Sequence, residues 1–261
     1  MRDLLRYIYR RFLPLRLKQQ IDIFYSLRGA DILPKLIDKP AGKNILVLAP
    51  HPDDEVIGCG GTLYKHHLAG DKITVVYMTD GSKGAEPKSW GEELAKKRKE
   101  EAKEAAKIIG IDELIFLNNP DGELTINKQT LNQIKLVLEK IKPDLVYLPF
   151  ILERHPDHRI TSEIFIKCVK KWKNFSGYCC AYEVWTPLMP NYLVDIGEYT
   201  KIKVKALNKF KSQISRVNII DAALGFAKYR AVLHTGLDTF VEAFLFCKIK
   251  EYLKLYKLIK K

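Results

Sequence analysis

The sequence predicts an α/β protein with a Rossmann-like, doubly wound and largely parallel sheet that carries helices on both faces. Two observations support this prediction. Between residues 43 and 172, short apolar runs of strand length alternate four times with longer stretches of helical periodicity, a pattern typical of parallel sheets with right-handed crossovers. Clusters of histidine and aspartate follow the first and the fourth apolar run, and such sheets bind ligands where their strands end.

The elements follow one another without a convincing linker. In the first part of the chain we expect strands at 44–49, 73–78, 114–117 and 145–149, and helices at about 57–68, 92–109, 128–140 and 160–172. After residue 173 we expect strands at 178–186, 192–196 and 239–247, and helices near 198–213, 217–230 and 249–260. The prediction is therefore one domain at 43–247, with a helical arm at 1–42 before it and a basic helix at 248–261 after it.

The arm has its own pattern. Residues 4–27 are expected to be helical, with bulky apolar side chains set between arginines and a break at Pro14. Such a pattern is typical of an amphipathic helix that lies on a membrane surface. It is equally compatible with a helical arm packed on its own domain or on a second subunit, which would make the protein a homo-oligomer.

Composition limits the class of protein. The 261 residues are 47% hydrophobic and 29% charged, as expected of a globular chain. No apolar run approaches the roughly 20 residues that span a bilayer, and no secretory signal is evident. The five cysteines are odd in number and lack CxxC spacing, which indicates reduced thiols and a cytoplasmic protein.

The net charge of +13 is concentrated at the two ends. Residues 1–43 hold ten lysines and arginines against four acidic residues, and residues 248–261 hold six against one. Charged ends of this kind favour peripheral contact with an anionic membrane, at its inner face, over specific recognition of nucleic acid. A nucleic-acid-binding protein would also leave both histidine and aspartate clusters unexplained.

The two clusters have the composition of a metal site. His51 and Asp54 stand three residues apart on a turn that opens a helix, so both side chains can reach one cation. With His158 as the third ligand they would form the open site of a zinc hydrolase, in which zinc lowers the pKa of a bound water from about 15.7 to about 7. Asp53 lies between the first two ligands and suits the role of general base.

These residues carry a resemblance to a known family. The segment Ala49 to Glu55 and the later His155-Pro156-Asp157-His158 resemble the two core motifs of the PIG-L/LmbE family of metal-dependent N-deacetylases. Further matches are Thr79-Asp80-Gly81, the helix with Arg98 and Glu101, and Pro120-Asp121-Gly122. The resemblance covers roughly residues 43–247.

The resemblance implies a Rossmann-like enzyme that removes acetyl from an N-acetylated amino sugar such as N-acetylglucosamine. The basic ends of the chain favour a sugar that is lipid-linked or close to a membrane, as in glycan biosynthesis. The resemblance also implies that His51, Asp54 and His158 bind zinc and that Asp53 is the base. His155 would stabilise the oxyanion, held by Asp157.

The same resemblance places Arg98 and Asp121 at positions that contact substrate. Alternatively, Arg98 pairs with Glu101 or a neighbouring helix, and Asp121 only shapes a turn. Glu55 is expected to cap or pair at the helix start rather than bind metal.

Three other functions remain open from the sequence. The first is an amidase or deacetylase of a sugar-thiol or thiol conjugate, which would use the same metal chemistry. The second is the nucleic-acid-binding protein, and the third is a non-catalytic metal-binding paralogue. The presence of Asp53 argues against the third, because a purely structural site needs no base.

Overall fold

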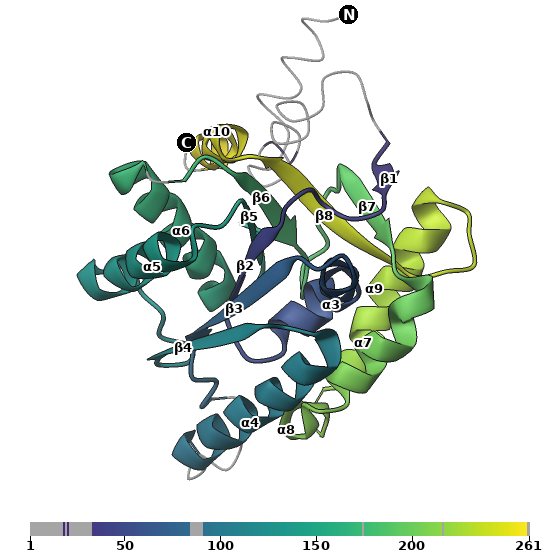
Figure 1. The fold of residues 1–261 in the computed structure, drawn as a ribbon, viewed down its shortest axis with the longest axis horizontal. Coiled ribbons are helices and arrows are strands. Elements are labelled where there is room, and N and C mark those ends of the chain that lie inside the picture. The colour runs from purple at the N-terminus through teal and green to yellow at the C-terminus, as the bar shows by residue number, and fades with distance from the viewer. Residues whose placement is uncertain are drawn as a thin grey trace, which may run out of the picture.

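A computed structural model describes residues 33–83, 91–173, 175–215 and 217–259, together with Lys18 and Gln20. At its centre is an eight-stranded sheet (Figure 1). In spatial order the strands are β1 (Lys35–Ile37), β7 (Tyr192–Asp195), β8 (Val241–Lys248), β6 (Tyr178–Tyr182), β5 (Leu145–Pro149), β2 (Asn44–Ala49), β3 (Lys72–Thr79) and β4 (Glu113–Asn119). Neighbouring strands run parallel except for β8, which is antiparallel to both β6 and β7.

Helices cover both faces of this sheet (Figure 1). One face carries α3 (Asp54–Leu68), α4 (Gly91–Ile109), α7 (Thr200–Leu207), α8 (Lys211–Ile214) and α9 (Ile219–His234). The other carries α5 (Lys128–Ile141), α6 (Pro156–Trp172) and α10 (Ile249–Ile259). A short 3-10 helix, Gly197–Tyr199, precedes α7. The doubly wound, largely parallel fold class is confirmed.

Two hydrophobic cores result, one on each face of the sheet. Strand β2 contributes to both, because successive side chains of a strand point to opposite faces: Leu46 and Leu48 belong to one core, and Ile45 and Val47 to the other. Such a strand is buried on both sides and therefore reads as a continuous apolar run. The basic helix α10 packs into the same core as α5 and α6, through Tyr252 and Leu255.

The expected element boundaries differ from the structure where polar residues open a helix. Helix α3 begins at Asp54 rather than Ile57, and α6 begins at Pro156 rather than residue 160, so the two histidine and aspartate clusters belong to the first turns of helices. Proline suits the first turn of a helix because its missing N–H would have no intrahelical partner there.

The C-terminal half departs further from the expectation. The strand expected at 178–186 ends at Tyr182, and the helix expected at 198–213 is divided between the 3-10 helix, α7 and α8. Phe210 lies at the break between α7 and α8, directly before α8, and its side chain is fully buried. The short edge strand β1 was not expected, because three residues carry too little pattern.

The helix expected at 4–27 lies outside the described residues, apart from Lys18 and Gln20, which are helical. Within the described part of the chain, no helix has the length and apolar character needed to cross a membrane.

Candidate active site

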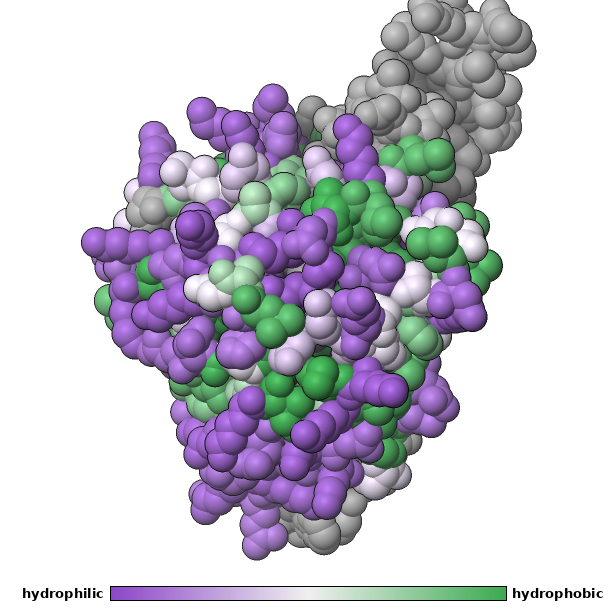
Figure 2. All heavy atoms as spheres, turned by 45° about the vertical axis from the view of Figure 1, so that its right-hand side comes forward, coloured by the Kyte–Doolittle hydropathy of each residue, from purple (hydrophilic) through white to green (hydrophobic). Residues whose placement is uncertain are grey.

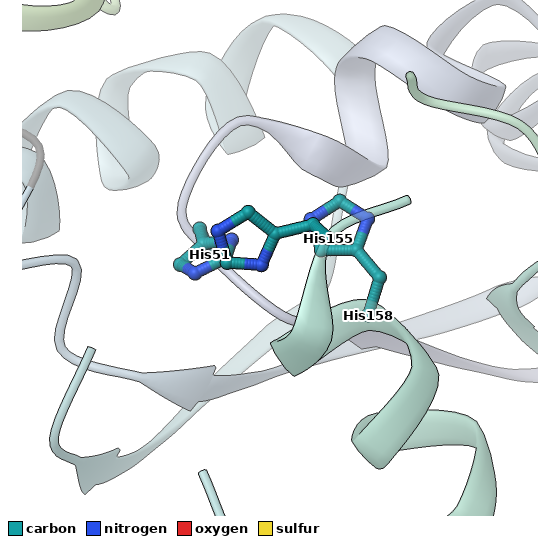
Figure 3. A group of neighbouring side chains, drawn as sticks. All are labelled: His51, His155 and His158. Carbon is teal, nitrogen blue, oxygen red and sulfur yellow. The ribbon is translucent and has the colours of Figure 1, made fainter. Parts of the chain in front are cut away.

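The two clusters meet at the edge of the sheet where the parallel strands end. His51 follows β2, whereas His155 and His158 follow β5, and these two strands are direct neighbours. Figure 3 shows the three imidazoles gathered at one point. Their ring centroids are 4.8 Å apart for His51 and His155, 5.0 Å for His155 and His158, and 5.3 Å for His51 and His158. The topology thus joins residues that are more than 100 positions apart in the sequence.

Asp54 lies between two of these imidazoles. Its Oδ2 atom is 3.1 Å from Nδ1 of His51 and 3.2 Å from Nε2 of His158, and it also accepts the backbone N–H of His51. Burial raises the pKa of Asp54, but the positive charge of His158, together with the hydrogen bond and charge of His51, outweighs it and holds that pKa well below its ordinary value. Asp54 is therefore an ionised oxygen donor between two nitrogen donors.

The pKa values of His158 and His51 shift in the opposite direction, upwards. Burial lowers the pKa of His158, but the carboxylate of Asp54 outweighs it and raises the pKa to about 9. For His51, burial is likewise outweighed by Asp121, Asp157 and Asp54, which raise its pKa well above the ordinary value. In the metal-free chain the neighbouring carboxylates therefore favour the protonated form of both rings.

The donor set fits a metal ion. His158 is fully buried, yet neither of its ring nitrogens has hydrogen-bond geometry to a partner, including Nε2 beside Asp54. Nε2 lies 3.2 Å from a carboxylate oxygen of Asp54, and Nδ1 lies 3.8 Å from one of Glu153. Buried nitrogens without a hydrogen bond are nevertheless rare and call for a specific explanation. Two overlapping groups have ligand atoms within 4.8 Å of one another: His51 with His155 and His158, and His51 with Asp121 and Asp157. Imidazole and carboxylate donors in a buried cluster are typical zinc ligands.

Asp157 contacts two of the three imidazoles. Its Oδ2 atom is 3.2 Å from Nε2 of His51 and accepts the backbone N–H of Gly122 at 2.7 Å. The residue touches His155 only through its backbone N–H, which donates to Nδ1 of that ring. The carboxylate of Asp157 therefore contacts His51 and the turn at 120–124, and its backbone N–H contacts His155, the ring that the sequence suggested it would hold.

Asp53 stands at the N-terminus of α3 in an unusual backbone conformation. Its φ is 128°, a value that side-chain-bearing residues rarely adopt, and its side chain is 6% exposed. Burial raises the pKa of Asp53 to about 7, against the opposing charge of Arg98 and with the help of Asp54. A carboxyl group that titrates near neutral pH can both accept and return a proton.

Arg98 is buried against the same loop. Its guanidinium donates to the carbonyl of Pro52 at 2.8 Å and of Gly81 at 3.1 Å, and Nη2 lies 3.3 Å from Oδ1 of Asp53. Gly81 has a positive φ, and a Cβ added there would come within 2.8 Å of the guanidinium. Arg98 therefore ties the loops after β2 and β3 together.

From the sequence, Arg98 could instead pair with Glu101, and Asp121 could only shape a turn. The carboxylate of Glu101 binds the N–H and hydroxyl of Ser212 rather than Arg98. Asp121 lies on the site, with Oδ1 3.1 Å from Nε2 of His51, and it also accepts the backbone N–H of Lys83. Asp121 thus both shapes the turn and faces the imidazole cluster.

Comparison with known proteins gives the family of this chain. Residues 46–169 match the family model described as PIG-L, GlcNAc-PI de-N-acetylase. A diacetylchitobiose deacetylase of Thermococcus kodakarensis is 32% identical over 66% of this chain and 70% of its own length. The chain belongs to the PIG-L family of N-deacetylases. It is accordingly an enzyme, a hydrolase of N-acetyl amides.

A further relative and a solved structure are also similar to this PIG-L chain. A probable N-acetyl-α-D-glucosaminyl L-malate deacetylase 2 of Bacillus anthracis is 28% identical over 66% of this chain and 82% of its own length. The structure of N,N'-diacetylchitobiose deacetylase from Pyrococcus horikoshii, solved with an inhibitor, aligns with a TM-score of 0.71 and 27% identity over 97% of this chain and 94% of that one.

Sequence reasoning missed one buried acid in the PIG-L site. Glu153 is fully buried, and its Oε2 atom accepts the backbone N–H groups of Val184 and Trp185 and lies 3.8 Å from Nδ1 of His158. Burial raises the pKa of Glu153, but His158 and its hydrogen-bond donors outweigh it and lower that pKa. Glu153 lies two residues before the second motif, which is the signal that could have found it.

A second missed feature is a kink in the helix that carries Asp54. Helix α3 loses helical geometry at Cys59. The buried pair Lys203 and Glu242 replaces the lost bonds: Lys203 Nζ donates to the carbonyl of Ile57, and Glu242 accepts the N–H groups of Gly61 and Thr62. This pair therefore fixes the direction of the first turn of α3. No local pattern reveals it, because its members lie far apart in the sequence.

Glu55 behaves as expected of a capping acid. Its Oε2 atom accepts the backbone N–H of Asp53, and its Oε1 atom accepts the hydroxyl of Tyr77 at 2.7 Å. Burial raises the pKa of Glu55 to about 8. Its oxygens are directed to these two donors, away from the imidazole cluster.

Proposed function

We propose that this chain is a zinc-dependent hydrolase that removes the acetyl group from the nitrogen of an N-acetylglucosamine-like sugar. The observation that carries the proposal is the position of Asp54 between His51 and His158, with Asp53 beside it. The names of the relatives supply the substrate class, because diacetylchitobiose and the glucosaminyl malate conjugate both contain an N-acetylated glucosamine unit.

In this proposal His51, Asp54 and His158 hold the zinc ion. Bound zinc would polarise the amide carbonyl and lower the pKa of the attacking water. The ring nitrogens of His158, which make no hydrogen bond, and the ionised oxygen of Asp54 support this ligand set. His155 belongs to the same imidazole cluster, and we assign it to the developing negative charge on the amide oxygen.

Asp53 is the proposed base. It accepts a proton from the water that attacks the amide carbon, and it returns that proton to the nitrogen when the carbon–nitrogen bond breaks. Water and the N-acetyl sugar thus become acetate and a free amino sugar. A pKa near 7 and a position next to Asp54 support this role.

Asp121 and Arg98 are proposed to contact the sugar beside the imidazole cluster. Asp121 Oδ2 lies 4.0 Å from Nη1 of Arg98, and its Oδ1 faces His51, so a sugar hydroxyl near the cluster would lie within reach of Asp121. Asp157 acts in this proposal as a positioning residue that orients His51.

The proposal extends to the place where the enzyme works. We infer that the unit at 43–247 carries catalysis in the cytoplasm, and that the basic ends at 1–42 and 248–261 make peripheral contact with an anionic membrane. The uneven charge along the sequence supports this inference. Such contact would suit a lipid-linked sugar of a glycan biosynthesis route if the site faces the bilayer, and a water-soluble sugar if the site faces away from it.

Self-association is proposed through the outer face of α9. Tyr229, Val232 and Leu233 of that helix are 54%, 62% and 56% exposed. On the face that Figure 2 displays, patches of hydrophobic side chains interrupt the hydrophilic surface. Sedimentation velocity on the wild type and on Val232→Glu tests this proposal, which expects an oligomer only in the wild type.

The substrate is tested by acetate release from free N-acetylglucosamine, diacetylchitobiose, a nucleotide sugar and a polyprenyl-diphosphate sugar, each with and without a chelator. Chelator-sensitive release from one of them supports the proposal and names the substrate. Release from none of them, by a chain that holds zinc, would reject N-acetylglucosamine-like sugars and direct the search to thiol conjugates.

A further inference from the structure

A groove with a volume of about 1310 Å³ lies between the end of α6 and the start of α10. Tyr178 at the beginning of β6 and Lys248 at the end of β8 belong to its lining. Because β6 runs parallel to β5, the groove opens at the strand starts, whereas the imidazole cluster lies beyond the strand ends. Figure 1 shows α10 beside β6 and β8 on this side of the sheet. The groove is therefore separate from the active site.

The groove combines an apolar floor with a cationic rim. Phe175 and Ile249 form part of the floor and are 8% and 4% exposed, and the half-buried Leu253 flanks them. Six exposed lysines form the rim: Lys170, Lys173, Lys248, Lys250, Lys254 and Lys257. The lining contains no acidic residue. In the part of the chain that the structure describes, no carboxylate forms an ion pair with any of the six.

The lysines are arranged unfavourably in the absence of an anion. Lys248 and Lys250 flank the first turn of α10, where the helix dipole is positive and disfavours cations. The acid of that turn, Glu251, accepts the backbone N–H of Lys248. Burial lowers the pKa of Lys170, and repulsion from Lys257 and Lys167 lowers it further. An anionic partner would relieve this repulsion.

We propose that this groove docks the chain on the anionic phospholipids of a membrane surface, with phosphate groups on the lysine rim and the apolar part of a lipid on the floor. The inference deepens the proposed peripheral contact, on which it rests, by naming the surface and its ligand. Single-stranded nucleic acid fits less well, because base stacking needs an exposed aromatic face. Of the two aromatic residues in the lining, Phe175 is buried, and the half-buried ring of Tyr178 is stacked on Phe246.

The location of the groove has a consequence for the enzyme. Docking through the strand starts would leave the opening at the strand ends directed away from the bilayer. A vesicle-bound enzyme should therefore hydrolyse a water-soluble N-acetyl sugar as fast as the free enzyme does. A lipid-linked sugar in the same bilayer would reach the site only after leaving the membrane surface.

The test is co-sedimentation of the full chain with vesicles of phosphatidylcholine alone or with 30% phosphatidylglycerol. The groove variant is Lys250→Glu with Lys254→Glu, two exposed lysines one turn apart on α10. The matched control is Lys201→Glu with Lys205→Glu, an equally spaced exposed pair on α7. Each double variant lowers the net charge by four, from +13 to +9. Acetate release and thermal melting are measured on all three proteins.

The wild type and the control should bind the anionic vesicles, and the groove variant should bind at least about tenfold more weakly. All three should bind neutral vesicles poorly and should keep the same acetate release. If the groove variant bound anionic vesicles as tightly as the wild type, the groove would be rejected as the docking surface. Peripheral contact through the N-terminal arm would then still stand as a proposal. Equal weakening of both variants, equal binding to neutral vesicles, or no binding by the wild type would also reject the groove as the docking surface. Acetate release reports separately on the proposed hydrolase.

Discussion

Nη2 of Arg98 lies 3.3 Å from Oδ1 of Asp53, and both side chains are almost completely buried. Burial disfavours the ionised carboxylate, whereas the guanidinium favours it, so the pKa of Asp53 near 7 reflects the balance between the two. The arginine that ties two loops together therefore also sets the proton affinity of the proposed base.

The first prediction concerns Arg98→Met. A base must be deprotonated to act, so activity falls as the pH drops through the pKa of Asp53. Loss of the guanidinium raises that pKa, and the acid limb of the pH–rate profile should move to higher pH. Arg98→Lys, which keeps a positive charge, should shift the limb less. If Arg98→Met lowered stability but left the acid limb of the pH–rate profile at the same pH, Arg98 would act only by connecting the two loops.

Asp53→Gly should stabilise the metal-free fold while abolishing turnover. Glycine adopts the φ of 128° without strain, and strained backbone of this kind costs about 1–3 kcal/mol. The raised pKa of the carboxyl has a second effect on the free energy of unfolding. Because Asp53 ionises near pH 4 in the unfolded chain but only near pH 7 in the folded one, the folded chain loses stability as the pH rises between these values. The gain should therefore be larger at pH 8 than at pH 5, in urea unfolding.

Asp54→Gly is the control for that prediction. Asp54 is helical, and its lowered pKa means that its carboxylate stabilises the fold above its unfolded-state pKa and loses this effect as the pH falls. Its removal should destabilise the chain at pH 8. Equal effects of the two substitutions would contradict the assignment of strain to Asp53.

Metal binding should release protons. The pKa of His158 is raised to about 9 and that of His51 is raised well above its ordinary value, because the neighbouring carboxylates favour the protonated form of both rings, and a metal must displace these protons. The apparent affinity for zinc should rise with pH up to about 9. Calorimetric titrations in buffers of different ionisation enthalpy count the protons, and a heat that does not depend on the buffer would refute the prediction.

Glu153→Gln should weaken zinc binding about 10- to 100-fold, the usual effect of removing the group behind a histidine ligand. The carboxylate lies 3.8 Å from Nδ1 of His158 and can accept its proton when Nε2 binds metal. Glu183→Gln is a suitable control, since that buried acid pairs with Arg230 away from the imidazoles. The comparison is made by competition with a chromogenic chelator, and equal affinities for both variants would exclude Glu153 from the site.

The sequence predicted the meeting of His51, Asp54 and His158 because strand order brings neighbouring loops to one edge of a parallel sheet. It did not predict that the carboxylate of Asp157 contacts His51, because side-chain partners depend on the loop conformations that follow each strand. The role of the Lys203 and Glu242 pair could not be predicted for a similar reason. The two side chains bind backbone groups of α3 that lack helical partners only because the helix is kinked.

The most direct measurement is acetate release from an N-acetylglucosamine derivative as zinc is added back to chelator-treated protein. The wild type should recover activity in proportion to bound zinc, up to one ion per chain. Asp53→Asn should bind zinc but regain little activity, about 10²- to 10⁴-fold less than the wild type, and His158→Ala should neither bind zinc tightly nor turn over. Full activity of the metal-free wild type, or wild-type turnover by Asp53→Asn, would contradict the proposed site.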